Sequence, residues 1–132
     1  MSAILLDTTV LIDALRGRMA AERLRALRRA GDTPYACAIN VEELSRGLRP
    51  REGKLLARLL DGLRIAPLGR REGQLAGGWR RSFARRGITL SQSDCLVAAA
   101  AVAVGARLAT GNVKDFPMEG VTVEHWPAGT PS

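Results

Sequence analysis

Short apolar runs alternate along the chain with segments in which apolar residues recur at helical spacing. The runs predict β-strands at Ala3–Leu6, Pro34–Ile39, Arg64–Leu68, Arg107–Thr110 and Val121–Glu124. The helical spacing predicts helices at Thr9–Leu15, Ala20–Ala30, Val41–Arg49, Leu55–Leu63, Arg70–Arg86 and Asp94–Val104. This alternating order predicts an α/β fold, in which a mainly parallel sheet carries helices on both faces.

The extent of the domain follows from the same pattern. We expect one domain over residues 1–126 and a disordered tail over residues 127–132. The longest uncharged run, Cys95–Gly105, is about half of what a membrane span needs, so it predicts a buried helix. No signal peptide is visible at the start of the chain. We therefore expect a cytoplasmic protein that does not associate with membranes.

The net charge of the chain gives information about its partners. Twenty basic residues, 18 of them arginine, face 13 acidic ones, for a net charge of +7. Such a field attracts a nucleic acid or an acidic protein, although biased composition and an ordinary solvated surface would look the same. Only 4% of residues are aromatic, which argues against a platform for stacked bases. Any nucleic acid is therefore expected to be contacted mostly through its phosphates.

Cysteine and histidine offer little metal chemistry. Cys37 and Cys95 stand far apart, and His125 is the only histidine. A zinc site is not expected, and two free, buried thiols fit a reducing compartment.

Parallel sheets bind ligands at the carboxyl ends of their strands, and four acids are candidates for that reason. Asp7 and Asp115 follow strands, Glu43 lies on a helix, and Asp94 stands at the start of the buried helix. Each has an ordinary explanation when taken alone. Asp7 could cap the helix that follows the first strand, although the hydroxyls of Thr8 and Thr9 could cap it equally well. Glu43 could be a surface residue like its neighbour Glu42, and the helical wheel favours Glu43 for a site only slightly.

The other two acids are similarly ambiguous. Asp94 and Ser91 match a capping box at the start of the buried helix, and Asp115 could serve a turn. The remaining aspartates, Asp13, Asp32 and Asp61, are expected at the surface or in turns. Four clustered carboxylates would repel one another, so the set as a whole makes physical sense around a cation. Oxygen ligands favour Mg²⁺ or Mn²⁺.

Four segments carry a family likeness. "DTTVLID", "EELSRG", "SDCLVAAAA" and "LATGNVKDF" resemble the signature blocks of PIN-domain ribonucleases. Their order, spacing and total length are similar to those of the VapC toxins of VapBC toxin–antitoxin systems. The resemblance implies a three-layer α/β/α sandwich.

The resemblance also assigns roles by position. It implies catalytic acids at Asp7, Glu43, Asp94 and Asp115, with the metal held by Asp7, Asp94 and Asp115. Polar residues that orient those ligands are implied at Thr8, Asn40, Thr110 and Asn112. Two positions depart from the family pattern: Thr9 replaces a frequent serine, and Asn40 stands where serine or threonine is common.

The implied function is an endoribonuclease toxin that uses Mg²⁺ or Mn²⁺ to hydrolyse RNA such as tRNA or rRNA. Such a toxin inhibits translation and growth, forms homodimers and is neutralised by a VapB-like antitoxin. Two alternatives stay open, a PIN-like nuclease directed at DNA and a non-catalytic, receiver-like domain that binds Mg²⁺. A phosphatase with a D-x-D motif fits less well, because Thr9 occupies the place of its second acid.

Overall fold

A single sheet of five parallel strands forms the centre of the molecule, in the order β3-β2-β1-β4-β5. The computed structural model describes residues 2–128. Its strands are β1 (Ala3–Leu6), β2 (Thr33–Cys37), β3 (Arg64–Ala66), β4 (Arg107–Thr110) and β5 (Val123–His125). Its helices are α1 (Thr8–Leu15), α2 (Met19–Arg29), α3 (Ala38–Arg46), α4 (Gly53–Asp61), α5 (Arg70–Ala84) and α6 (Gln92–Ala103), with a 3₁₀ turn η1 (Val113–Asp115).

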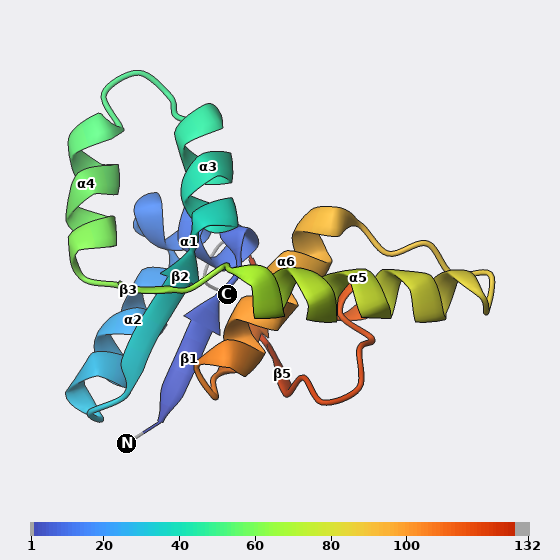
Figure 1. Ribbon diagram of the computed structural model, residues 1–132. Coiled ribbons are helices and arrows are strands. Elements are labelled where there is room, and N and C mark those ends of the chain that lie inside the picture. The colour runs from blue at the N-terminus through green and yellow to red at the C-terminus, as the bar shows by residue number, and fades with distance from the viewer. Residues whose placement is uncertain (1, 129–132) are drawn as a thin grey trace.

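Alternation along the strands divides the core between two faces of the sheet. Ile4 and Leu6 of β1 pack with apolar residues of α1, α2, α3 and α4. Leu5, which points the other way, packs with residues of α5 and α6. The α/β/α layering predicted from the sequence is therefore confirmed (Figure 1).

Helix α6 packs directly on the sheet, as its composition predicted. Cys95 and the run Val97–Ala101 are at most 1% exposed. Both cysteines are free and buried, as expected. None of the helices within residues 2–128 has the length and apolar character needed to cross a membrane.

The largest differences in element boundaries occur where β2 meets α3. The apolar run Pro34–Ile39 predicted one strand, but β2 ends at Cys37 and α3 begins at Ala38. The side chain of Asn40 explains the early start, because its Oδ1 accepts a hydrogen bond from the Cys37 amide, at 2.9 Å. This hydrogen bond satisfies the amide of Cys37, the N-cap residue, so the helix begins directly after the strand. Strand β3 similarly stops at Ala66, since Pro67 has no amide hydrogen for the ladder.

Asp13 overturns one expectation. It was expected at the surface, yet it is 2% exposed, and neither carboxylate oxygen has a hydrogen-bond partner. It lies three residues after the buried Val10, and therefore on the same face of α1. Its nearest ionic partner is Arg18, with 3.6 Å between Nη1 and Oδ1.

The predicted tail lies mostly outside the described residues. Pro127 and Ala128 follow β5 without regular structure, and residues 129–132 are not described. The disordered tail and the domain boundary at residue 126 therefore stay predictions.

Candidate active site

Asp7 stands at the carboxyl end of the central strand β1, with only 7% of its surface exposed. It occupies the N-cap position of α1, but its side chain makes no capping hydrogen bond. Instead, Thr110 at the end of β4 donates its hydroxyl hydrogen to Asp7 Oδ2, at 2.8 Å. The cap explanation for Asp7 is therefore wrong, and its carboxylate is held by the neighbouring strand.

The electrostatics at Asp7 oppose its ionisation. Burial raises its pKa most, and the charges of Asp94 and Glu43 raise it further, against the lowering effect of the Thr110 hydrogen bond. The three carboxylates lie at the end of β1, on α3 and on α6. The fold therefore brings their like charges within electrostatic range of one another.

A chain of hydrogen bonds positions Glu43. Its Oε1 accepts from the Thr8 hydroxyl, at 2.6 Å, and Thr8 Oγ1 accepts in turn from Asn40 Nδ2, at 3.1 Å. Asn40 is fully buried, whereas Glu42 is exposed. Glu43 is therefore the glutamate on the side of Asp7, and Thr8 and Asn40 form the hydrogen-bonded chain behind it.

Thr8 and Thr9 do not cap α1, contrary to expectation. The Thr8 hydroxyl is used on Glu43, and Thr9 Oγ1 accepts from the Gly111 amide, at 3.0 Å. This second contact ties the start of α1 to the loop after β4. A Cβ at Gly111 would lie 3.3 Å from Thr9 Oγ1, so the loop and the start of α1 approach closely here. Sequence reasoning did not single out Gly111, because only the neighbouring strand shows the close approach.

Asp94 lies in the first turn of α6. Ser91 is the N-cap of that helix, and its Oγ accepts from the Asp94 amide, at 3.1 Å. This contact is the Ser91 half of the predicted capping box, and it is the part of the box that the structure shows. Burial raises the pKa of Asp94, and the charges of Asp115 and Glu43 raise it further, while Ser91 lowers it.

Asp115 and Asn112 are less closely attached to the site. Asp115 is exposed on η1, and it acts on Asp94 through its charge. The Asn112 side chain is exposed, and the residue contributes its backbone amide, which donates to Thr110 Oγ1 at 3.0 Å. The structure therefore brings Asp7, Glu43 and Asp94 together and keeps Asp115 at the rim.

The donor set suits a hard cation that retains water. Asp7 and Asp94 are carboxylates in a partly dry environment, with repulsion that a cation would relieve. Within residues 2–128, no three carboxylate, cysteine or histidine side chains converge closely enough to hold an ion by themselves. Mg²⁺ does not need such a cage, because it usually keeps several waters and binds through one or two carboxylates.

Comparison with known proteins places these residues in a family. A model of the PIN domain family matches residues 4–117. Ribonuclease VapC10 of Mycobacterium tuberculosis is 38% identical over 120 residues, which cover 87% of this chain and 86% of the relative. Ribonuclease VapC19 of the same species is 38% identical over 119 residues, covering 86% of this chain and 92% of the relative.

Solved structures share the architecture. A chain of VapBC2 from Rickettsia felis, bound to a DNA fragment from the promoter, superposes with a TM-score of 0.83 at 23% identity, covering 94% of this chain and 98% of that one. A chain of DNA-bound VapBC from Salmonella typhimurium gives 0.78 at 22%, covering 96% and 99%. At these identities the likeness is one of fold. The matched blocks, the two relatives and the shared architecture lead to one conclusion: this chain belongs to the PIN domain family, as a VapC-type member.

Proposed function

We propose that this chain is an endoribonuclease toxin that hydrolyses RNA phosphodiester bonds with the help of Mg²⁺ or Mn²⁺. The observation that carries the proposal is the set of carboxylates Asp7, Glu43 and Asp94, held within electrostatic range of one another at one edge of the sheet. Two relatives named ribonucleases support RNA as the substrate. The net charge of +7 supports a polyanion as well.

We assign Asp7, Asp94 and, from the rim of the site, Asp115 to hold the ion directly or through water, as the resemblance to the family implies. When bound, the ion supplies charge neutralisation at the phosphate and a more acidic water molecule. Thr110 fixes the orientation of the Asp7 carboxylate, and the Thr8 hydrogen bond does the same for Glu43. No described residue donates to the second oxygen of Glu43, which leaves that oxygen available to orient the attacking water.

Histidine does not take part in this scheme. His125 lines a hollow with Arg23 and Trp126, on the side of the sheet that α2 covers. The proton of the attacking water is therefore accepted by a carboxylate or by solvent, and we assign that role to Glu43.

The biological role follows from the VapC type. We propose that RNA cleavage, at a tRNA or rRNA, inhibits translation and growth in the cytoplasm. A VapB-like antitoxin would neutralise the toxin, as suggested by the VapBC complexes that share this fold. We further propose that the toxin acts as a homodimer.

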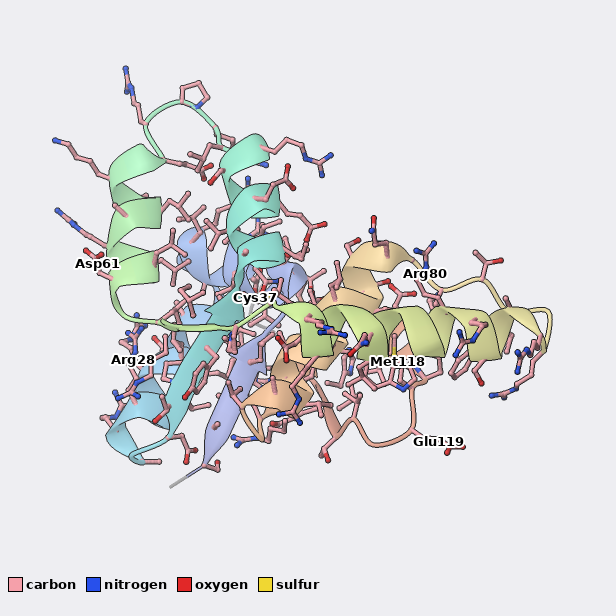
Figure 2. All side chains as sticks on the ribbon, in the orientation of Figure 1. Arg28, Cys37, Asp61, Arg80, Met118 and Glu119 are labelled. Atoms are coloured by element: carbon pink, nitrogen blue, oxygen red, sulfur yellow. The ribbon has the colours of Figure 1, made fainter. Side chains whose placement is uncertain are left out.

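The test is cleavage of RNA and DNA oligonucleotides of one sequence in the presence of Mn²⁺. Asp7→Asn and Asp94→Asn are expected to lower RNA cleavage about 10³-fold, which corresponds to several kcal/mol of lost transition-state stabilisation. Asp61→Asn is the matched control, because Asp61 is exposed at the end of α4, a helix that carries none of the four acids of the site (Figure 2). Full activity in both site variants would reject the assignment. Faster cleavage of DNA would make the chain a DNA-directed nuclease instead.

Inducible expression tests the role in cells. Growth arrest by the parent, its loss with Asp7→Asn and its relief by the neighbouring small reading frame are expected together. Arrest that persists with Asp7→Asn would contradict a toxin that acts by cleaving RNA.

A further inference from the structure

Arg80 is a positive charge near the acidic site that the proposed mechanism does not use. It is exposed on α5, and Figure 2 shows it on the upper side of that helix, the side on which α6 begins. Helix α5 packs against α6, so Arg80 stands on the side of α5 that faces the start of α6. No salt bridge among the described residues involves it.

The sides of α5 are distinct. At 100° per residue, Gly73, Gly77 and Arg80 fall on one flank of the helix, which we call the glycine flank. Arg71 and Gly78 fall on the opposite flank. Along the helix axis, they lie about one turn before and one turn after Leu75.

The neighbours of the opposite flank show which way each flank faces. Arg71 and Leu75 line a hollow together with Ala99, Val102 and Ala103, which belong to the second half of α6. Helix α5 crosses α6, with the start of α6 on one side of α5 and its end on the other (Figure 1). The flank opposite Arg71 and Leu75 is therefore the one nearer the first half of α6. The carboxylate of Asp94 lies at that end.

Packing within the chain does not explain the glycines of this flank. A Cβ added at Gly73 or Gly77 would meet nothing within 4 Å. Glycine inside a helix lowers stability relative to alanine. What the missing side chains provide is bare helix backbone beside Arg80, where another backbone can approach closely.

We propose that the glycine flank of α5 carries the sugar–phosphate backbone of the RNA into the acidic site, with the Arg80 guanidinium bound to a phosphate. This inference rests on the proposed function. Carboxylates alone repel the substrate, so a fixed positive charge beside them is needed to hold the strand. A guanidinium binds phosphate through two parallel hydrogen bonds, and few aromatic side chains are available to stack on bases.

The first experiment measures binding without cleavage, in the Asp7→Asn background with Mg²⁺. The probe is a fluorescein-labelled oligoribonucleotide of mixed sequence, and its anisotropy is followed over a range of KCl concentrations. Arg80→Gln is expected to weaken binding about threefold to tenfold, and to reduce the slope of log K against log salt by about 0.7, the value for one phosphate contact on a single strand. Arg29→Gln, an equal change of charge on an exposed position of α2, is expected to alter neither.

Equal behaviour of Arg80→Gln and Arg29→Gln would overturn the proposal. An equal loss of affinity for poly-L-aspartate would also overturn it, because the flank would then be a general anion surface. Cleavage by the parent is measured in parallel and judges the proposed function separately. If the parent cleaves RNA while Arg80→Gln and Arg29→Gln bind RNA equally well, the proposed ribonuclease activity is supported and the proposed path of the RNA along α5 is rejected.

The second experiment compares two glycines one residue apart. Gly77→Gln and Gly78→Gln each replace a helix glycine for which a Cβ meets nothing within 4 Å, so both are expected to raise the melting temperature. Only Gly77→Gln puts a side chain on the glycine flank, and only it is expected to weaken RNA binding, again about threefold to tenfold. Unchanged binding by Gly77→Gln, or equal weakening by both variants, would contradict the assignment.

Discussion

Charged side chains have opposite surroundings at the two edges of the sheet. At the amino edge, Arg107 of β4 donates from Nε to Glu124, at 2.8 Å, and lies 3.7 Å from Asp32. Hydrogen bonds from Ser2 are the main reason why the pKa of Asp32 is lowered. At the carboxyl edge, Asp7 and Asp94 have raised pKa values, and each faces other carboxylates.

The difference separates positions that serve stability from positions that serve a ligand. Ions at the amino edge are paired within the chain, so they stabilise the fold without help. Acids at the carboxyl edge oppose folding when ionised, and the proposed function gives them a cation and a phosphate to bind. Substitutions at the two edges should therefore have opposite consequences for activity and stability.

The largest expected effect is at the carboxyl edge. Thr110→Val removes the hydroxyl that holds Asp7 while preserving the shape of the side chain. We expect RNA cleavage to fall about tenfold to a hundredfold, the usual range for a group that orients a metal ligand. Thr33→Val, the same change at the amino edge, is expected to leave cleavage rates unaltered. Equal rates in both variants would contradict a role for Thr110 in positioning Asp7.

The Asn40 network should give the next largest effect. Asn40→Ala removes both the bond to the Cys37 amide and the support of Thr8. We expect about a tenfold loss of cleavage and a loss of about 1–2 kcal/mol in the free energy of unfolding. Asn40→Ser restores the residue type that is common in the family and should recover part of the activity. If the alanine variant cleaves RNA like the parent, Glu43 does not depend on this network.

At the amino edge the expected effect is on stability alone. Arg107→Met leaves Glu124 and Asp32 without their common partner, and should lower the free energy of unfolding by about 1 kcal/mol. Denaturant titration measures this change, with Arg29→Met as a control at an exposed position. RNA cleavage should be unchanged. A loss of cleavage in a stably folded Arg107→Met would remove the contrast between the edges.

The smallest effect is a dependence of stability on pH in EDTA. Because the pKa of Asp7 is raised in the folded state, folding binds protons there, and this contribution to stability falls as pH rises above the usual aspartate value of 3.8. Asp7→Asn removes the effect, so its melting temperature should increasingly exceed that of the parent as pH rises. A gap that stays constant or narrows would show that Asp7 ionises without cost.

Local pattern was sufficient for most of the fold. Strands β1 and β4 occur at the predicted residues, and each predicted helix is present with shifts of a few residues at its ends. Periodicity succeeds here because every helix buries one face or, for α6, most of its central residues. It failed at Pro34–Ile39, because a capping amide started the helix inside an apolar run.

The candidate site was only partly predictable. Asp7 follows from the rule that ligands gather at the carboxyl ends of parallel strands, and Asp94 from its place at the start of the buried helix. The helical wheel favoured Glu43 over Glu42 only slightly. The contact that distinguishes the two glutamates is the hydrogen bond from Thr8, which lies on another helix. Asp13 was misassigned for a similar reason, because its burial depends on the elements packed around α1.

The sequence by itself determined the order of strands and helices, the parallel sheet, the positive charge and the four acids in family order. Those features depend on residue type and on neighbours within a few positions along the chain. Only the tertiary structure decided which hydroxyl serves which carboxylate, which acids repel one another and which flank of α5 faces Asp94. These relations join residues on different elements, and they arise only when the sheet brings β1, β2 and β4 side by side.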